Sequence, residues 1–382
     1  MKKKLIIIVT VPVVLDTWLK GQAKYLSRFY EVEIITSYAD NINCIEEYEG
    51  VKIKIVDFNR KINIIKDLKV LIQLLKYMRQ EKPAIVYTLT PKAGLLGMVA
   101  SWISRVPHRV HCVVGLPHLE AEGRRKTILT MTEKITYFFS SKIYCNSINL
   151  QKVVTTMTTK PIGVIGNGSV NGVDTEYFKD RLSQVEKEKV IKSLGFQKND
   201  FVIIFVGRIV KDKGINELIN VFDKLNLKYS DIRLLLIGDY KNESDPISTK
   251  SMQIIEENLS IKYLEFQENV GEFMSVSKLF VLPSYREGLP NVLIEAGSYG
   301  VPLVATNING CNEVIKENKN GLLVKKKDEQ DLSDAIEKFI IDKEFYQKIK
   351  SNVRESIVSR YDQKYFFKEL LYEFQNIEDI DK

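Results

Sequence analysis

The sequence predicts an α/β protein made of two doubly wound parallel-sheet domains, and three features indicate this. Short apolar runs rich in β-branched residues alternate with segments of helical period along the chain, a pattern typical of parallel sheets covered by helices on both faces. The chain has 382 residues, more than one ordinary core accommodates. The polar, glycine-dense stretch 166–174 has too few apolar residues for a core. We therefore expect one domain over 1–170 and a second over 171–354.

Strand-like runs in the first half are each bounded by turns or helical segments. The expected strands are 4–10, 32–36, 51–58, 83–90, 108–114, 142–146 and 162–165, and the expected helices are 66–80, 91–103, 132–139 and 148–156. Residues 11–21 should form a loop before a helical segment through Leu26. Because this loop lacks the pattern G-x-G-x-x-G, a nicotinamide or flavin dinucleotide site after the first strand is disfavoured.

The second half repeats the alternation. A charged helix over 180–195 precedes strands expected at 201–206, 232–237, 263–266, 280–283 and 303–306, an edge segment at 321–324, and helices from Ile215 and over 331–350. The last stretch, 353–374, has an amphipathic helical pattern. We expect this C-terminal helix, about 355–382, to cross back and pack on the first domain.

Composition excludes several classes of protein. No run approaches the roughly 18–20 apolar residues of a transmembrane helix. The basic start and apolar run 5–9 resemble the opening of a signal peptide, but Pro12 and Asp16 interrupt the run and no small-residue cleavage site follows. We interpret the run as a buried first strand. The four cysteines are scattered without metal-ligand spacing, which fits reduced thiols in a cytoplasm: Cys44, Cys112, Cys145 and Cys311.

The net charge of +7 conceals an asymmetry between the two halves. Residues 1–165 hold 25 Lys and Arg against 13 Asp and Glu, a net charge of +12, and the remainder carries −5. Within the most basic stretch, residues 64–78 place apolar residues at helical spacing with Lys66, Lys69, Lys76 and Arg79 between or beside them. Such a helix suits an anionic membrane surface or a phosphorylated acceptor, and the alternative is an ordinary solvated helix face.

The stretch 285–299 predicts a phosphate-binding start of a helix after a buried strand. Pro290 suits the first helical position, so the amides of Asn291 and Val292 should point out of the helix end, where anions bind. Glu287 lies on the preceding loop, and Glu295 lies on a largely apolar face of the helix. The two hydroxyls of a ribose would supply donors for Glu295. The alternative is that Glu295 pairs with a core arginine and Glu287 is a solvated charge.

A second glycine turn follows the strand 201–206. It carries Arg208 and Lys213 between Gly207 and Gly214 at the carboxyl end of the predicted sheet. The guanidinium fork and the compact ammonium group are well suited to a diphosphate, and both can neutralise charge that develops on a leaving group. Because these two residues supply positive charge, the site requires no metal.

In the first half, two candidate side chains follow strand ends. Ligands of doubly wound sheets collect beyond the carboxyl ends of the strands, where Lys92 and His118 are expected. An imidazole can exchange a proton near neutral pH. The loop 120–126 that follows is predicted to be mobile and basic, so Arg124 and Arg125 are candidates to contact an acceptor. The alternative is a plain surface loop.

Taken together, these motifs resemble one family. Gly207-Arg208 with Lys213-Gly214, Glu287 with Glu295, and Gly310 with Glu313 resemble the retaining glycosyltransferases of family 4. That family has the GT-B architecture, in which two Rossmann-like domains face a central cleft. The first half is similar to bacterial enzymes that extend lipid-linked sugars for capsule, exopolysaccharide, O-antigen or glycoprotein glycans. The stretches 91–97, 115–118 and 167–174 carry that likeness.

The resemblance implies roles for individual residues. Arg208 and Lys213 would hold the donor diphosphate, Glu287 would contact the transferred hexose, and Glu295 would bind the ribose. His118 would lie near the sugar and the acceptor, with Lys92, Arg124 and Arg125 on the acceptor side. The remaining donor-binding candidates are Gly207, Gly238, Gly288, Leu289, Pro290, Asn291 and Val292. The family is usually independent of metals, and a front-face reaction is most often described for it.

The resemblance therefore predicts a cytoplasmic enzyme, peripheral at the inner face of the plasma membrane. It would move a sugar from a nucleotide sugar, in the first instance a UDP-sugar, to a polyprenyl-diphosphate-linked saccharide. No cofactor and no nucleic-acid partner are expected. Two alternatives stay open: a nucleotide-sugar epimerase on the same fold, and a non-catalytic partner of another transferase. An epimerase would carry other acid and base residues, and a non-catalytic partner would have lost those of the site.

Overall fold

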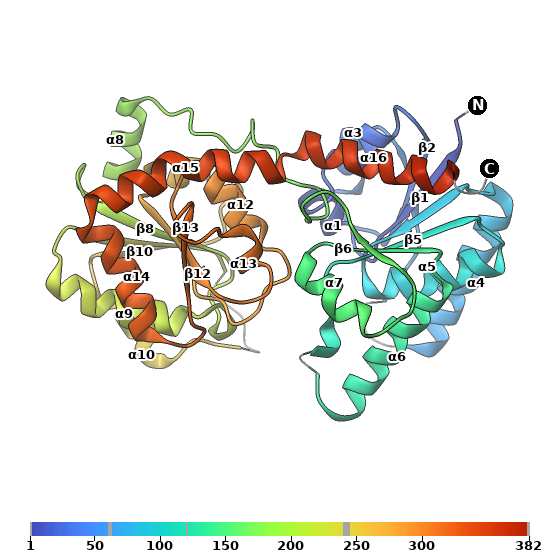
Figure 1. Cartoon of the computed structure of the whole chain (residues 1–382), viewed down its shortest axis with the longest axis horizontal. Coiled ribbons are helices and arrows are strands. Elements are labelled where there is room, and N and C mark those ends of the chain that lie inside the picture. The colour runs from blue at the N-terminus through green and yellow to red at the C-terminus, as the bar shows by residue number, and fades with distance from the viewer. Residues whose placement is uncertain (1, 60–62, 120, 240–244, 380–382) are drawn as a thin grey trace. The chain divides into compact units, whose positions relative to one another are not determined.

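The computed structural model describes residues 2–59, 63–119, 121–239 and 245–379, which form two compact units (Figure 1). The first unit comprises Met1–Gly172 with Gln363–Lys382, and the second comprises Val173–Asp362. The change between units at 172/173 lies within the glycine-dense stretch, two residues after the expected boundary. The return at 362/363 lies eight residues after the expected end of the second domain at 354.

The first unit contains a parallel sheet with the strand order β3-β2-β1-β4-β5-β6-β7. Its strands are β1 Lys4–Ile8, β2 Glu31–Thr36, β3 Lys52–Ile55, β4 Ile85–Thr88, β5 His108–Val113, β6 Lys142–Cys145 and β7 Ile162–Val164. The chain proceeds outward from β1 to β3 and then returns to the centre at β4. This reversal confirms the predicted doubly wound topology.

Alternate side chains of β1 enter two different cores. Leu5 and Ile7 pack with the side chains of α2 and of the C-terminal helix α16, whereas Ile6 and Ile8 pack with α4 and α5 on the opposite face. This alternation is the consequence of the two-residue period of a strand. The helices of this unit are α1 Val13–Thr17, α2 Gln22–Leu26, α3 Ile42–Glu49, α4 Ile64–Glu81, α5 Pro91–Ile103, α6 Gly123–Phe139, α7 Ile148–Thr155 and α16 Gln363–Asp379.

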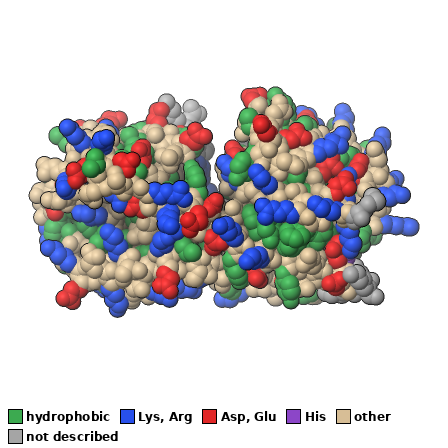
Figure 2. Space-filling view, turned by 90° about the horizontal axis from the view of Figure 1, so that it is seen from above, with side chains coloured by type: hydrophobic (Ala, Val, Ile, Leu, Met, Phe, Trp, Pro, Cys, Tyr) green, Lys and Arg blue, Asp and Glu red, His purple; other side chains and the backbone are tan. Residues whose placement is uncertain are grey.

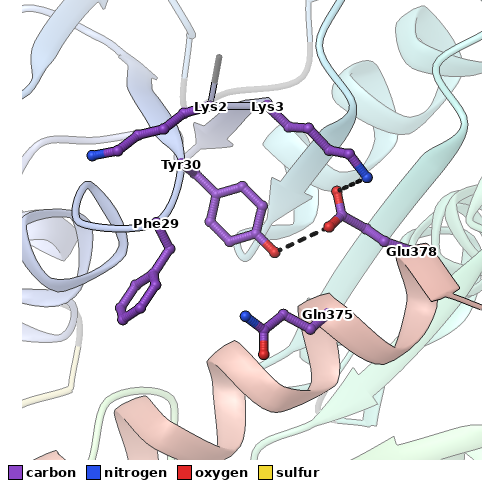
Figure 3. Close-up of a pocket in the computed structure, with 6 residues that line it drawn as sticks. All are labelled: Lys2, Lys3, Phe29, Tyr30, Gln375 and Glu378. Carbon is purple, nitrogen blue, oxygen red and sulfur yellow. Dashed lines mark hydrogen bonds and ion pairs between the residues drawn. The ribbon is translucent and has the colours of Figure 1, made fainter.

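Helix α16 is part of the first unit's core, although it is the last element of the chain. Phe366, Leu370 and Phe374 are buried among residues of β1 and β4. Near its end, Glu378 accepts a hydrogen bond from Tyr30 at 3.4 Å and forms an ion pair with Lys3 at 3.2 Å (Figure 3). The hollow that these residues line lies at the amino end of β1, at the opposite edge from the candidate residues of this unit.

The second unit contains a parallel sheet with the strand order β10-β9-β8-β11-β12-β13. Its strands are β8 Phe201–Val206, β9 Ile232–Ile237, β10 Ile261–Leu264, β11 Leu279–Leu282, β12 Leu303–Thr306 and β13 Gly321–Val324. Its helices are α8 Gln184–Ser193, α9 Ile215–Lys228, α10 Thr249–Glu257, α11 Gly271–Val276, α12 Asn291–Ser298, α13 Cys311–Val314, α14 Glu329–Ile341 and α15 Lys343–Tyr361. Figure 1 shows helices on both faces of this sheet.

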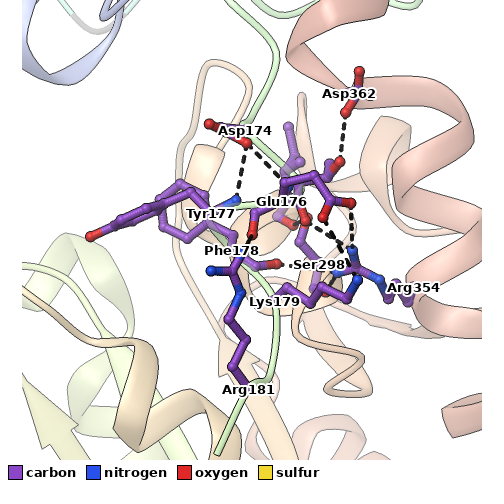
Figure 4. Close-up of polar contacts among 11 residues, drawn as sticks. Asp174, Glu176, Tyr177, Phe178, Lys179, Arg181, Ser298, Arg354 and Asp362 are labelled. Carbon is purple, nitrogen blue, oxygen red and sulfur yellow. Dashed lines mark hydrogen bonds and ion pairs between the residues drawn. The ribbon is translucent and has the colours of Figure 1, made fainter.

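The segment that enters the second unit is fastened to α15 and α12 by polar contacts (Figure 4). The Arg354 guanidinium donates to the carbonyl oxygens of Thr175, Phe178 and Ser298. The Thr175 hydroxyl donates to the Asp362 carboxylate at 2.5 Å. Asp362 has an extended backbone, with φ −58° and ψ 133°, and therefore ends α15. The single predicted helix over 353–374 is wrong in this respect, since α15 and α16 are separate and belong to different units.

Three further predictions of local structure are wrong. The stretch 11–21 contains the short helix α1, and the single helix predicted over 331–350 is divided between α14 and α15 at Asp342. The predicted mobile loop is largely helical, because α6 begins at Gly123; its first residue, Glu120, lies outside the described residues. From Arg124 onward α6 contains no glycine or proline, and its exposed charged face is compatible with a surface helix.

Candidate functional site

The strands β8 and β11 are neighbours at the centre of the second sheet, where the direction of winding reverses. Beyond their carboxyl ends lie the two segments that carry the predicted donor-binding residues, 207–214 after β8 and 283–292 after β11. In doubly wound folds ligands bind at such a point. The topology thus places both predicted motifs side by side, although they are more than seventy residues apart in the sequence.

Close backbone packing joins these two segments. Gly214 adopts φ +71°, and a Cβ atom at this position would lie 2.1 Å from the carbonyl oxygen of Pro283. Only glycine therefore allows α9 to begin so near the end of β11. Directly before Gly214, the Nζ of Lys213 lies 2.6 Å from Oε1 of Glu287. Both side chains are largely buried, with exposed fractions of 19% and 13%.

Arg208 has a different environment from Lys213. It lies on the turn after β8 and is exposed, whereas its neighbours Ile209 and Val210 are fully buried. Gly238, at the end of β9, has φ +142°, and a Cβ atom there would lie 2.0 Å from the carbonyl oxygen of Gly207. The two strand ends therefore approach each other through backbone alone, and the Arg208 side chain projects from this tight turn into solvent.

Helix α12 begins one residue later than the sequence predicts. Pro290 is the N-cap with an extended backbone, φ −77° and ψ 102°, and Asn291 is the first helical residue. The prediction of Pro290 at the first helical position is wrong because its ψ of 102° is not helical, and its carbonyl accepts the amide of Leu293 at 3.1 Å as that of an N-cap residue does. The amides of Asn291 and Val292 precede this bond, so they stay at the helix end as predicted.

The loop before α12 is held in place from a third segment, which follows β12. The side-chain amide of Asn309 donates to the carbonyl oxygens of Glu287 and Gly288, each at 3.3 Å. Gly310 has φ +79°, and a Cβ atom there would lie 1.7 Å from the oxygen of Gly288. Leu289 is 9% exposed and packs in the domain core. These contacts support the loop that carries Glu287.

Glu295 lies within α12 and is partly buried. Removal from water raises the pKa of its carboxyl group to about 7. Among the hydrogen bonds and ion pairs that the structure shows between described residues, none involves this carboxylate, so the pairing with a core arginine that we considered from the sequence is not observed. A carboxylate in this position would gain from a ligand that donates hydrogen bonds.

In the first unit, Lys92 and His118 occupy protected positions. The Nζ of Lys92, in the first turn of α5, forms an ion pair with Asp67 at 2.8 Å. His118 lies on the short 3₁₀ helix Pro117–Leu119 and is 6% exposed. Its Nδ1 is buried without a hydrogen-bond partner among the described residues. Burial and the nearby charge of Lys126 lower the pKa of His118, which favours the neutral imidazole.

Arg124 and Arg125 lie in the first turn of α6 and are exposed. They are therefore fixed on a helix rather than carried by a loop. Glu133 follows on the same helix and is 4% exposed, and burial raises the pKa of its carboxyl group to about 7. The nearby Tyr137 only partly opposes this shift, so Glu133 belongs to the interior of the unit rather than to its surface.

The contacts that hold the donor-side loops are not predicted by the sequence. Asn309 was not identified, although it directly precedes Gly310, and nothing in its local pattern marks it as a hydrogen-bond donor to the loop of Glu287. Asp212 and Arg286 each adjoin a predicted site residue and bind each other at 2.7 Å. Only the pairing of β8 with β11 could have indicated that they meet.

The site thus contains two basic side chains, two carboxylates and the start of a helix, all on segments that follow the two central strands β8 and β11. This set can hold a phosphate and orient polyhydroxylated groups beside it.

Comparison with known proteins is consistent with this chemistry. Residues 186–356 match the family "Glycosyl transferases group 1", and residues 11–147 match "Glycosyl transferase 4-like". The capsular polysaccharide biosynthesis glycosyltransferase CapM of Staphylococcus aureus is 32% identical over 356 residues, which cover 92% of each chain.

The chain therefore belongs to the glycosyltransferases that these two family models describe. A second relative of this chain is the UDP-Gal:alpha-D-GlcNAc-diphosphoundecaprenol alpha-1,3-galactosyltransferase of Escherichia coli. The two are 30% identical over 78% of this chain and 77% of that one. The crystal structure of Anabaena HepE in complex with UDP has a similar fold, with a TM-score of 0.82 at 21% identity over 98% of this chain and 100% of that chain. The predicted GT-B fold is therefore confirmed.

Proposed function

We propose that this glycosyltransferase is a retaining enzyme of family 4 that transfers a sugar from a UDP-sugar to a polyprenyl-diphosphate-linked saccharide in the synthesis of a surface polysaccharide. The observation that carries the donor half of this proposal is the meeting of Lys213, Glu287 and the start of α12 beyond the neighbouring strands β8 and β11. The lipid-linked acceptor is supported by the relatives, because the E. coli enzyme is named for a diphosphoundecaprenol substrate.

Each donor-side residue has a separate task in this proposal. Lys213 and Arg208 bind the diphosphate, and the amides of Asn291 and Val292 bind its distal phosphate. Glu295 accepts hydrogen bonds from the ribose hydroxyls. Glu287 positions the hexose and stabilises positive charge that develops at its anomeric carbon. The choice of uridine is supported by HepE, whose structure contains UDP.

The reaction that these groups support retains the anomeric configuration. The acceptor hydroxyl attacks the anomeric carbon on the face from which the diphosphate departs, and the bond between that carbon and the phosphate oxygen breaks. The proton of the acceptor passes to the leaving phosphate. Lys213 and Arg208 stabilise the charge on the nucleoside diphosphate, so the protein's own cations serve where a metal would otherwise be needed.

Transfer is tested by incubating the purified protein with tritiated UDP-sugars and a panel of undecaprenyl-diphosphate-linked saccharides. We expect one donor and acceptor pair to give a labelled lipid product whose new linkage is α by NMR when the donor is α-linked. A β-linked product would contradict retention. Interconversion of the UDP-sugar without transfer would favour an epimerase.

Metal independence gives a separate prediction. The rate of transfer should change by less than about twofold, which is within assay variation, when 5 mM EDTA is present. The reason is that Arg208 and Lys213 supply the positive charge at the diphosphate. The same preparation is assayed with added Mg²⁺ or Mn²⁺. Loss of activity in EDTA that is restored by either ion would contradict the assignment of the charge to these two side chains.

We also propose that the first unit binds the anionic inner surface of the plasma membrane through α4. None of the helices within the described parts of the chain has the length and apolar character needed to cross a bilayer. Ile64, Ile65 and Leu68 at the start of α4 are 81%, 72% and 55% exposed, whereas Val70 and Leu74 are buried. Exposed Lys66 and Lys69 lie among the three exposed apolar side chains. On the face seen in Figure 2, basic side chains are dispersed among acidic and apolar ones.

Vesicle flotation tests this membrane contact. Exchanging both lysines, Lys66→Glu with Lys69→Glu, should abolish flotation with phosphatidylglycerol vesicles at low salt, because each basic residue near an anionic surface contributes about 1 kcal/mol. The matched control is Lys343→Glu with Lys348→Glu, which changes the charge equally on exposed positions of α15. Absence of wild-type binding at low ionic strength would remove the membrane part of the proposal.

A further inference from the structure

Three successive side chains of the loop after β11 bind two side chains of the segment after β8 and one in the first turn of α9. The Tyr285 hydroxyl donates to the Glu217 carboxylate, the Arg286 guanidinium binds Asp212, and Glu287 binds Lys213. The backbone repeats this pairing, since the amide of Tyr285 donates to the carbonyl oxygen of Asp212 at 2.8 Å. We refer to these three side-chain contacts as the loop clamp.

The Arg286–Asp212 contact is the most directional of the three. Nε and Nη2 of Arg286 lie 2.9 Å and 2.7 Å from the same oxygen, Oδ2 of Asp212. The Asp212 side chain is 17% exposed and that of Arg286 is 51% exposed. The backbone amide of Asp212 in turn donates to the carboxylate of Asp245 at 2.8 Å. The backbone of Asp212 is thus anchored to Asp245 while its carboxylate accepts hydrogen bonds from Arg286.

The three contacts of the clamp differ in what a donor would do to them. In the proposed function, on which this inference rests, the diphosphate takes up Lys213 and the hexose takes up Glu287. The Lys213–Glu287 ion pair must then loosen when the donor enters. Tyr285–Glu217 and Arg286–Asp212 have no such task, and they connect the same two segments directly beside the ion pair.

We propose that Asp212 and Arg286 are positioning residues that keep Lys213 and Glu287 at donor-binding distance after their own ion pair has opened. Without the outer contacts, an opened Lys213–Glu287 pair would leave fewer contacts between the two loops, among them the backbone hydrogen bond from Tyr285 to Asp212 and the close packing at Gly214. The donor would then have to order both loops as it binds. A geometric displacement of about 1 Å can cost a large part of the benefit of a preorganised site.

The sign of the expected effect separates positioning from simple electrostatics. Asp212 is an anion near Lys213 and Arg208, and its charge interacts with both. If only the local field mattered, neutralising Asp212 would strengthen the binding of an anionic ligand, and neutralising Arg286 would weaken it. If the pair positions the loops, both substitutions weaken binding, and their combination weakens it no further than the stronger single substitution.

The test is a double-mutant cycle on the binding of UDP, measured by isothermal titration calorimetry at fixed salt. We expect Asp212→Asn and Arg286→Gln each to raise the Kd for UDP about three- to tenfold, and the double variant to match the weaker-binding single variant. Arg286→Lys should recover part of the loss, because it keeps the charge but not the fork. The matched control is Lys224→Gln, which breaks a 2.9 Å ion pair with Glu329 in the same unit and should leave the Kd unchanged.

Each other outcome overturns a defined part of the account. A tighter Kd for Asp212→Asn would show that the field of the carboxylate dominates and would exclude the positioning role. Unchanged Kd values with lowered thermal midpoints would make the pair a stabilising contact only. If the wild-type protein itself does not bind UDP, the proposed function fails, and the positioning role that rests on it falls with it.

Discussion

Replacing Lys213 by alanine is expected to lower kcat by about 10²- to 10³-fold, the size of effect that follows from removing one preorganised charge-stabilising donor. Lys213 lies on the turn between β8 and α9, and its ammonium group is largely buried 2.6 Å from the Glu287 carboxylate. In the proposed reaction it offsets the charge that grows on the diphosphate as the glycosidic bond breaks. The rate at saturating donor and acceptor measures this effect directly.

Lys211→Ala is the matched control, because Lys211 lies two residues earlier on the same turn and is exposed. It should retain kcat within about twofold, since an exposed charge outside the site contributes little. The loss of Lys213 also leaves Glu287 without its ion pair, so the thermal midpoint of each variant must be measured. A folded Lys213→Ala protein with unchanged kcat would contradict the role of Lys213 at the leaving group.

Glu295→Gln is expected to weaken the binding of UDP about 10- to 100-fold, because hydrogen bonds to a charged group contribute about 1.5–3 kcal/mol. The same substitution should stabilise the free protein at pH 8. The carboxyl group has a pKa of about 7 in the folded protein against an ordinary value of 4.5. The unfolded chain therefore releases this proton first, and the group lowers the free energy of unfolding as the pH rises from about 4.5 to 7.

Glutamine removes this loss, so the thermal midpoint of Glu295→Gln should exceed that of the wild type at pH 8 and equal it at pH 4.5. The gain is at most about 3 kcal/mol, from 1.36 kcal/mol for each unit of pKa. Opposite changes in affinity and stability distinguish a carboxylate kept for a ligand from one that holds the fold together. A variant that is less stable at pH 8 would show that Glu295 has a structural partner.

The affinity of the wild-type protein should itself depend on pH. A ribose that donates hydrogen bonds to Glu295 prefers the ionised carboxylate, so the Kd for UDP should fall about tenfold between pH 6 and pH 8, as expected for linkage to a pKa near 7. The same titration on Glu295→Gln subtracts the effect of the ligand's own phosphate. Identical pH profiles for the two proteins would contradict contact between Glu295 and the ligand.

The strands and their terminal turns were predictable because their signals are local. Runs such as 201–206 and 303–306 are continuous apolar segments followed by glycine or polar residues, and β8 and β12 coincide with them. Because the strands of a parallel sheet all point the same way, their carboxyl ends lie along one edge of the sheet. This arrangement predicts that Lys213 and Glu287 lie at that same edge. Their 2.6 Å contact required, in addition, that β8 and β11 be neighbours.

The contacts between loops were not predictable for the same reason. Asn309 reaches the carbonyl oxygens of Glu287 and Gly288 from a turn more than twenty residues later. Its role depends on the position of a separate strand, β12, and on Gly310, which allows the backbones to approach. Two helix ends were also not predicted: Pro290 precedes α12, and Asp362 ends α15. Both boundaries are set by the backbone conformation of these residues in the folded unit rather than by the local sequence.

The central claim, that the second unit binds a nucleotide sugar, is tested most directly by thermal shift with EDTA present. The panel contains UDP, GDP, ADP, NAD and a set of UDP-sugars. A ligand at 100 times its Kd should add about 2.7 kcal/mol to the free energy of unfolding. We expect UDP and one UDP-sugar to raise the thermal midpoint, which would also identify the donor. If no nucleotide in the panel raises it, the account is contradicted, and a non-catalytic partner of another transferase becomes the better explanation.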